Sequence, residues 1–251
     1  MVIEYLENNT ISQKCILSNI KLTKFEIINN KMIYDFTNCR KKDAQIKLHQ
    51  HRFNNGANRN AFFCIFISDS EKLQILKKKI REKNDIDSIA PDLKCRLIGA
   101  ELAEIFNKIL NKNSITTNIE IIKNKICQLS NSKEFFTIEE FLKGDYEKFS
   151  NNYEFYSKKN TIYNNLAQCF SHWTFDYSGS KLLINDIQGV ETKYTDIQVI
   201  TSDGDANEFG LGNMGRNSML SFLLGHECND FCKKLGLNDL KVVSQKLKLG
   251  L

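Results

Sequence analysis

The stretch from Cys169 to Cys232 constrains this chain most, because metal-binding and carboxylate side chains are concentrated there. It contains, in order, the segments CFSHWTFDYSGSKLLINDIQGVETKYTDIQ, FGLGNMG and GHECNDFC. The chain thus carries a candidate metal site and a candidate carboxylate site within about a quarter of its length. An enzyme is therefore the leading interpretation, and its candidate residues can be named individually.

Four side chains of this stretch have the spacing of a zinc site. If Met219 to Leu235 forms one amphipathic helix, Cys228 and Cys232 lie one turn apart on the same face, with His226 just before them. His172 is the best fourth ligand, because the remaining histidines fall in the other half of the chain. Zinc in a closed structural site takes four such ligands. The alternative is two core cysteines and a histidine at a helix end.

Carboxylates form the second signal. The segment KLLINDIQGV reads as one strand that ends at Gly189, and alternation along it would put Asp186 and Gln188 on the same face. Two oxygen ligands at a strand end suit Mg²⁺. Asp196 follows a turn that can return it to Asp186, and two aspartates are the minimal set for phosphoryl transfer to a hydroxyl. The alternative is an aspartate that only caps a turn.

The glycine turn Gly210, Gly212 and Gly215 has the spacing of a dinucleotide motif. That motif requires a preceding strand and a surrounding βαβ unit. Here a polar loop, SDGDANE, precedes the turn. The pattern therefore favours a helix entry over a dinucleotide site.

Composition adds only broad limits. The chain has 251 residues and a net charge of +5, with its lysines in short runs such as Lys77-Lys78-Lys79. A small zinc-containing nucleic-acid binder is the weakest interpretation, and no nucleic-acid partner is expected. We see no secretory signal and no apolar run long enough to cross a membrane. Eight cysteines without a secretory signal indicate free thiols and a cytoplasmic location.

The pattern predicts a mixed α+β fold. Strands are expected at 16–22, 25–29, 31–36, 60–68 and 123–131, and a helix opened by Pro91 is expected over 92–112. Thr137 to Glu140 reads as the cap of a short helix, and 144–155 reads as a loop. After Gln168 we expect a helix, a strand pair, a loop, the glycine turn and a terminal helix.

Taken together, the FSHW, NDIQGV, YTD, FGLGNMG and HECNDFC segments closely resemble the alpha-kinase family of atypical protein kinases. This family includes the myosin heavy chain kinases and the elongation factor 2 kinases, and the resemblance is nearest to the latter. The resemblance is strong over about 165–235 and weaker back to about residue 50. It implies a single two-lobed catalytic domain over 1–251, with a zinc-stabilised C-terminal lobe. The implied parts are an N-lobe at about 1–126, a hinge at about 127–131 and a C-lobe at about 132–251.

The resemblance also implies a role for each matching residue. It implies structural zinc on His172, His226, Cys228 and Cys232, and Mg²⁺ with ATP phosphates on Asp186 and Gln188. Asp196 matches the catalytic aspartate, and the glycines 210, 212 and 215 match a loop on the peptide-substrate side. The implied ATP contacts are Lys78, Arg59, Gly56, Ala57, Asn58, Gln128 and Leu129.

Two departures from the family pattern bear on activity. Ile197 stands where a proline commonly follows the catalytic aspartate, and Gln128 stands at a hinge position that is usually acidic. The lysine could also be a neighbour of Lys78. We therefore expect a serine/threonine protein kinase that uses ATP on a protein substrate. The alternative is a pseudokinase that acts as a protein-binding scaffold.

Overall fold

The computed structural model describes residues 9–28, 31–39, 41–55, 59–80, 84–241 and 243. The chain forms two compact units, each built from separate stretches. The first unit is Met1–Lys21, Phe36–Leu93 and Lys123–Phe141, and the second is Leu22–Asp35, Lys94–Ile122 and Leu142–Leu251. The predicted α+β class is confirmed. The division at a hinge over 127–131 stays a prediction.

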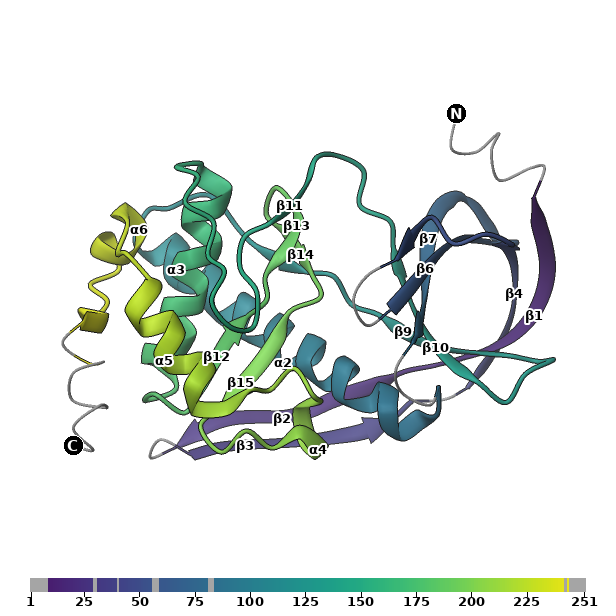
Figure 1. Ribbon diagram of the computed structural model, residues 1–251, viewed down its shortest axis with the longest axis horizontal. Helices are drawn as coiled ribbons and strands as arrows, with labels where there is room; N and C mark the ends of the chain where they lie inside the picture. The colour runs from purple at the N-terminus through teal and green to yellow at the C-terminus, as the bar shows by residue number, and fades with distance from the viewer. Residues whose placement is uncertain are drawn as a thin grey trace. The chain divides into compact units, whose positions relative to one another are not determined.

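In the first unit, one antiparallel sheet closes into a barrel (Figure 1). Its hydrogen-bonded order is β4-β1-β9-β10-β7-β6-β5, and an additional pairing of β4 with β6 closes the ring. The strands are β1 (Thr10–Ser18), β4 (Lys42–His49), β5 (Asn54–Asn55), β6 (Arg59–Phe66), β7 (Asp69–Lys79), β9 (Lys125–Leu129) and β10 (Phe135–Glu140).

Alternation along these strands separates an inner from an outer set of side chains. The inner set is apolar and rich in thiols: Cys15, Ile46, Cys64, Leu76, Cys127, Leu129, Phe136 and Ile138. On the outside, Ile126 and Phe135 pack with Ile89 and Leu93 from the start of helix α2 (Ile86–Lys112). The barrel therefore has an apolar interior and one face covered by a helix.

The predicted start of this helix is wrong. Helix α2 begins at Ile86, not after Pro91, which lies inside it. The cause is a local cap: the Asp85 carboxylate accepts the backbone N–H of Ser88, a group that otherwise has no helical partner. This cap starts the helix early enough for Ile89 to join the core.

The predicted short helix near Thr137 is also wrong. Residues 135–140 form strand β10, which pairs with β7 on one side and β9 on the other. Thr137, Ile138 and Glu139 are all buried. Pairing on both edges outweighs the local capping pattern, as tertiary context often does.

The second unit contains short strands and most of the helices. One sheet has the order β11-β13-β14-β8, and β12 pairs separately with β15. The strands are β8 (Glu120–Ile121), β11 (Tyr146–Lys148), β12 (Leu182–Asn185), β13 (Gln188–Val190), β14 (Lys193–Thr195) and β15 (Gln198–Thr201). The helices are the rest of α2, α3 (Ile162–Tyr177), α4 (Ala206–Phe209), α5 (Gly215–Gly225) and α6 (Asp230–Lys234). Strand β11 thus occupies part of the predicted loop.

Three predicted boundaries in this unit are wrong. Helix α3 begins before Gln168, because the Thr161 hydroxyl caps it by accepting the N–H of Asn164. The single strand expected up to Gly189 is divided into β12 and β13. The expected terminal helix is divided into α5 and α6, and the side chain of Asn229 caps the second piece.

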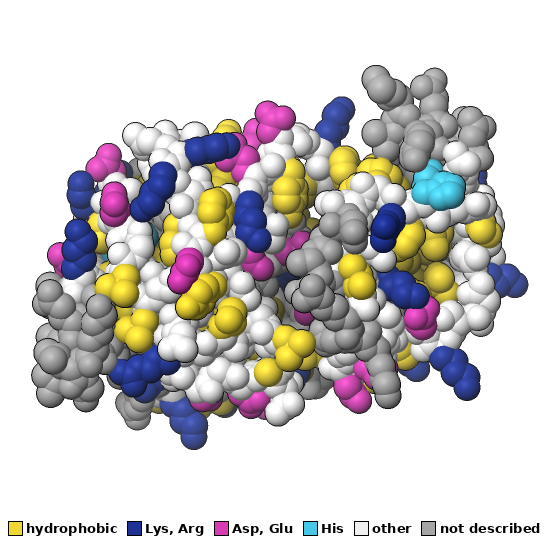
Figure 2. All heavy atoms as spheres, viewed as in Figure 1, with side chains coloured by type: hydrophobic (Ala, Val, Ile, Leu, Met, Phe, Trp, Pro, Cys, Tyr) yellow, Lys and Arg dark blue, Asp and Glu magenta, His cyan; other side chains and the backbone are white. Residues whose placement is uncertain are grey.

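Strands β2 (Ile20–Ile28) and β3 (Lys31–Asn38) form a separate two-stranded ribbon. In the second unit, Tyr34 of this ribbon approaches Phe209, with ring centroids 6.0 Å apart. Among the described residues, no helix is long and apolar enough to cross a membrane. Figure 2 shows basic and acidic side chains interspersed over the face in view, so the positive charge is spread out there.

Candidate functional site

Two aspartates of the second unit lie at the break between two short antiparallel ladders. Strand β12 pairs with β15 up to Asn185, and β13 pairs with β14 from Gln188 onward, in the same register. The residues between the two ladders include Asp186 on one strand and Asp196 on the opposing one. The predicted return of Asp196 toward Asp186 therefore follows from the strand pairing.

Both aspartates have a left-handed backbone, with φ of 55° at Asp186 and at Asp196. Such conformations are uncommon for residues other than glycine, although aspartate tolerates them better than most. The left-handed residue ends β12, so the two residues do not lie on one continuous strand, and a shared face for Asp186 and Gln188 stays a prediction. Strained backbone of this kind clusters at functional sites.

Arg96 of α2 fixes the orientation of the Asp196 carboxylate. One guanidinium nitrogen donates to Asp196 Oδ1 at 2.9 Å and to Thr195 Oγ1 at 2.7 Å. Another donates to the carbonyl of Ile122 at 3.1 Å. The Arg96 side chain is only 3% exposed, whereas that of Asp196 is 25% exposed. Arg96 thus holds the Asp196 carboxylate from the protein interior, and the carboxylate remains partly accessible to solvent.

Asp186 has a lysine beside it. The ammonium of Lys148 lies 3.0 Å from Asp186 Oδ1, and a quarter of the Asp186 side chain is exposed. Lys148 is also the β-sheet partner of Gln188. Carboxylate and amide oxygens are ligands that Mg²⁺ accepts, so Asp186 and Gln188 fit this ion chemically.

The predicted zinc ligands come together. The ligand atoms of His172, His226, Cys228 and Cys232 all lie within 4.8 Å of one another. Cys228 Sγ is 3.8 Å from His172 Nδ1, and Cys232 Sγ is 3.6 Å from His226 Nε2. Tetrahedral zinc with ordinary bond lengths separates sulfur and nitrogen ligands by about 3.5 Å. The cluster could therefore hold a metal ion, and it fits zinc.

Each ligand comes from a different local environment. His172 lies on the buried face of α3, His226 is the C-cap of α5, and Cys232 lies in α6. Cys228 lies in the connection between α5 and α6, so the two sulfurs converge without the shared helix that the sequence predicts. A bound ion would tie three helices together.

The thiol chemistry of the cluster favours a cation. A hydrogen bond from the Cys169 thiol lowers the pKa of Cys232, and contacts with His172 and His226 lower it further, against the opposing effect of burial. Burial raises the pKa of Cys228 to about 11, and the neighbouring Cys232 adds to the increase. Zinc binds thiolates, and its charge would reverse the repulsion between these two sulfurs.

Asp176 lies behind the cluster. Its carboxylate is 3.8 Å from His172 Nε2, on the ring atom other than the one that faces Cys228. The same carboxylate accepts hydrogen bonds from the backbone and side chain of Asn238. Carboxylates commonly orient metal-binding histidines by a hydrogen bond, but at 3.8 Å the contact of Asp176 with Nε2 is longer than a hydrogen bond.

The glycine turn connects α4 to α5 and is fixed to β15. A side chain at Gly212 would place its Cβ 2.1 Å from Oε1 of Gln198, so a larger residue there would displace the Gln198 side chain. Gln198 in turn donates to the carbonyl of Phe209 at 2.7 Å. The side chain of Asn213 pairs with Thr201 through two hydrogen bonds. No strand runs directly into the turn, which agrees with a helix entry.

In the first unit, the predicted nucleotide contacts do not share one face of the sheet. Leu129 points into the barrel. Gln128 is its neighbour on β9, so by alternation along the strand its side chain points outward. Arg59, at the start of β6, forms an ion pair with Asp92 of α2 at 2.7 Å. Gly56, Ala57 and Asn58 lie outside the described residues.

The lysines of β7 also alternate between faces. Lys78 pairs with Glu134 at 2.9 Å, and both side chains are substantially exposed, at 37% and 43%. Lys77 pairs with Glu139 at 2.6 Å, and these side chains are 10% and 3% exposed. Lys79 lies 3.6 Å from Asp92. Lys77 thus has the most enclosed ion pair of the three.

Arg96, Lys148 and Glu139 are the polar partners that sequence reasoning missed. Their contacts join residues far apart in the chain, so no local motif reveals them. Only Arg96 left a signal: it is a charged residue within the apolar stretch LKCRLIGA, where burial without a partner would be costly.

Comparison with known proteins gives a consistent result. The sequence profile of the alpha-kinase family matches residues 54–232. The chain is 30% identical over 223 residues to alpha-protein kinase vwkA of Dictyostelium discoideum, which covers 82% of this chain and 35% of that protein. It is 31% identical over 204 residues to human eukaryotic elongation factor 2 kinase, covering 78% and 27% respectively. The chain therefore spans about a third or less of these relatives.

Solved structures show the same fold. The alpha-kinase domain of myosin heavy chain kinase A in complex with ADP matches with a TM-score of 0.72 at 24% identity, over 91% of this chain and 97% of that one. An inactive variant of that domain in complex with ATP matches with a TM-score of 0.73 at 23% identity, over 91% and 99%.

Proposed function

The chain belongs to the alpha-kinase family, and on that premise we propose that it transfers the γ-phosphate of ATP to a protein hydroxyl, preferably of threonine. The observation that carries this proposal is that Arg96 holds the accessible carboxylate of Asp196, and that Asp186 and Asp196, both with a left-handed backbone, lie on opposing strands between the two ladders. Relatives named as kinases and a homologous fold seen with ADP and with ATP support it.

Asp196 is the proposed catalytic residue. A fixed carboxylate can orient the attacking hydroxyl and accept its proton as the bond to phosphorus forms. The two hydrogen bonds from Arg96 to Asp196 and Thr195 keep the carboxylate in one orientation. Positioning of this kind supplies much of the rate in phosphoryl transfer.

Asp186 and Gln188 are the proposed Mg²⁺ ligands. When bound, the ion would neutralise charge on the ATP phosphates. Lys148, whose ammonium lies 3.0 Å from Asp186 Oδ1, would orient this carboxylate. The glycines 210, 212 and 215 form the proposed peptide-substrate loop.

The proposed nucleotide contacts in the first unit are Arg59, one lysine of β7, the segment Gly56, Ala57 and Asn58, and the pair Gln128 and Leu129. Within β7, the proposal starts from Lys78, and the enclosed ion pair of Lys77 with Glu139 makes Lys77 the competing candidate. Single substitutions distinguish the two lysines.

Zinc is proposed to be structural. Its four ligands, His172, His226, Cys228 and Cys232, complete a tetrahedral set and leave no position for a reacting water. The ion would therefore stabilise the second unit and take no part in phosphoryl transfer.

The decisive experiment is phosphate transfer by the purified 251-residue chain, using MgATP labelled in the γ-phosphate. The wild type should label itself or a basic peptide that contains threonine. Asp196→Ala should abolish transfer, but it also removes the counterion of Arg96. Asp196→Asn, whose amide oxygen can still accept from Arg96, should be inactive with a nearly unchanged melting temperature. Asp145→Ala, which alters an exposed aspartate of the same unit, should remain active. An inactive wild type, tested where a related kinase is active, would refute the proposal.

A pseudokinase scaffold is the second candidate. The division of the predicted nucleotide contacts between two faces of the barrel sheet favours it. Binding of MgATP without any transfer, and without an effect of Asp196→Ala on binding, would support the scaffold.

A further inference from the structure

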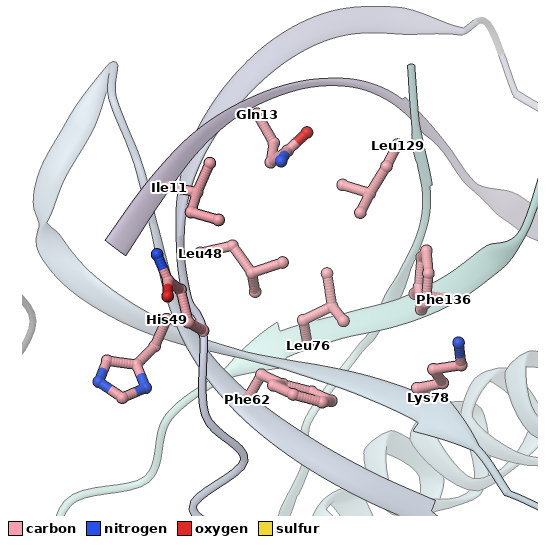
Figure 3. A pocket seen from close by; sticks show the side chains of 10 residues that line it. Ile11, Gln13, Leu48, His49, Phe62, Leu76, Lys78, Leu129 and Phe136 are labelled. Atoms are coloured by element: carbon pink, nitrogen blue, oxygen red, sulfur yellow. The ribbon is translucent and has the colours of Figure 1, made fainter. Parts of the chain in front are cut away.

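The barrel of the first unit contains a pocket of about 330 Å³ (Figure 3). This volume is at the small end of the range for ligand pockets, about 300–1,000 Å³. The described residues that line it are Ile11, Gln13, Leu48, His49, Gln50, Phe62, Leu76, Lys78, Leu129 and Phe136.

The walls of the pocket are mainly apolar. Leu48, Leu76 and Leu129 point into the barrel from three different strands, with the rings of Phe62 and Phe136 beside them (Figure 3). None of the described lining residues carries a carboxylate. An apolar ligand would therefore remove apolar surface from water without burying a negative group of the protein.

Two polar side chains reach the same space. Figure 3 shows the amide of Gln13 directed into the barrel and the ammonium of Lys78 close to the ring of Phe136. The Lys78 ammonium lies 5.9 Å from the centroid of that ring. Lys78 is the only cation of the Lys or Arg type among the described lining residues.

The partner of Lys78 can be exchanged. Lys78 and Glu134 form a half-exposed ion pair, and such pairs contribute little net stability. An ammonium has three donors, so it can bind a second carboxylate or release the first. The pocket thus combines an apolar interior with one available positive charge.

We propose that this barrel pocket binds a small apolar molecule with a single carboxylate, such as a medium-chain fatty acid. The chain of the ligand occupies the space between Leu48, Leu76 and Leu129, and its carboxylate meets Lys78, with Gln13 as a further donor.

This pocket differs from a nucleotide site. A triphosphate carries several negative charges, and the pocket offers one lysine to neutralise them. Arg59, the proposed phosphate contact, pairs in β6–β7 register with Lys79, one residue from Lys78 and hence on the opposite face of the sheet. Because Lys78 and Leu129 line this pocket, the proposal assigns the nucleotide contact of β7 to Lys77, the competing candidate, and Leu129 to the apolar ligand.

Calorimetric titration of the full chain with decanoate and decanol tests the charge. Decanoate should bind once per chain and more tightly than decanol. Lys78→Gln should weaken decanoate roughly fivefold or more, because it removes the charge-assisted contact. Glu134→Gln should strengthen decanoate, because it removes the competing carboxylate. Neither substitution should alter decanol binding.

Two controls fix the location. Lys47→Gln alters a lysine that precedes Leu48 on β4 and is exposed, so decanoate binding should not change. Ile11→Trp narrows the pocket at a side chain that is 46% exposed, so it should block both ligands without disturbing the core. Unchanged melting of Ile11→Trp confirms that loss of binding is not unfolding.

Three results would overturn the proposal. One is the absence of decanoate binding at millimolar concentration. The second is displacement of decanoate by MgATP, which would make the pocket part of the nucleotide site. The third is equal affinity of wild type and Lys78→Gln for decanoate.

Discussion

The barrel and the second unit are held together in different ways. The barrel has long strands in continuous ladders, from β1 paired with β4 to β6 paired with β7, and an apolar interior. The second unit has strands of two to four residues, such as β8 and β12. It relies on Arg96, on the zinc-type cluster and on side-chain ties such as Asn213 with Thr201.

This difference shows which kind of backbone can position catalytic side chains. A regular ladder gives each side chain one of two directions, so the barrel divides its polar residues between its faces. The broken ladders of the second unit place Asp186 and Asp196 on opposing strands in a backbone conformation that a regular ladder does not allow. Single polar contacts should therefore matter more for stability in the second unit than in the barrel.

Loss of the metal cluster should have the largest effect. Cys232→Ser, or removal of metal by a chelator, should destabilise the protein by several kcal/mol, since structural zinc contributes directly to folding free energy. Calorimetric melting, together with elemental analysis that finds about one zinc per four-ligand site, measures this. Cys39→Ser, a free cysteine of the first unit, is the control. Metal-free protein with unchanged melting would contradict the prediction.

Arg96→Met should have the next largest effect, about 3 kcal/mol of stability, because it removes the hydrogen bonds of a guanidinium that is 3% exposed, one of them to a partly exposed carboxylate. Asp196 and the Ile122 carbonyl would both lose a donor. Denaturant unfolding gives the stability, and phosphate transfer should fall with it. Lys108→Met on the same helix is exposed and should change neither. If Arg96→Met were stable and fully active, single polar contacts would not matter more for stability in the second unit than in the barrel.

Lys77→Met tests whether the barrel too depends on one polar pair. It leaves Glu139 buried without its cation, at 3% exposure, and should cost about 3 kcal/mol. Lys78→Met alters a half-exposed pair and should cost less than about 1 kcal/mol. Denaturant unfolding compares the two variants. Equal losses would show that burial of the pair is not decisive.

The same two variants sharpen the nucleotide assignment. The lysine that contacts ATP should, when replaced, raise the KM for MgATP more than its neighbour does. An effect on KM with unchanged stability would separate binding from folding.

Asp203 should give the smallest effect. A hydrogen bond from the Thr201 hydroxyl lowers the pKa of Asp203, with smaller help from backbone N–H groups. A folded-state pKa below the unfolded value of about 3.9 stabilises the protein above that pH, and the contribution is lost as the pH falls further. Asp203→Asn should therefore flatten the decline in stability below about pH 4. If the unfolding free energy of Asp203→Asn fell as steeply with decreasing pH as that of the wild type, the prediction would be wrong.

Much of the barrel could be predicted from sequence. Runs such as NAFFCIFIS have the composition of a buried strand, and β6 forms there. The errors arose where distant pairing overrode a local signal, as at Thr137 in β10. Closure of the barrel by β4 and β6 has no sequence signal, because it depends on residues brought together only by folding.

Sequence motifs predicted which residues belong to the candidate site, but not how those residues are arranged. The spacing of His226, Cys228 and Cys232 indicated a metal cluster, yet the helix assumed for it does not exist. The left-handed backbone at Asp186 and Asp196 could not be read from residue type. Arg96 could not be paired with Asp196, since the two are far apart in the chain.

The left-handed aspartates also set stability and activity against each other. Glycine adopts this backbone at little steric cost, so replacing Asp186, whose partner Lys148 is 45% exposed, by glycine would relax the chain while it removes a carboxylate. Selection for thermal stability alone would therefore favour variants that are more stable but lack activity. An engineering campaign on this domain would have to hold both positions fixed and seek its gains elsewhere, for example in the barrel.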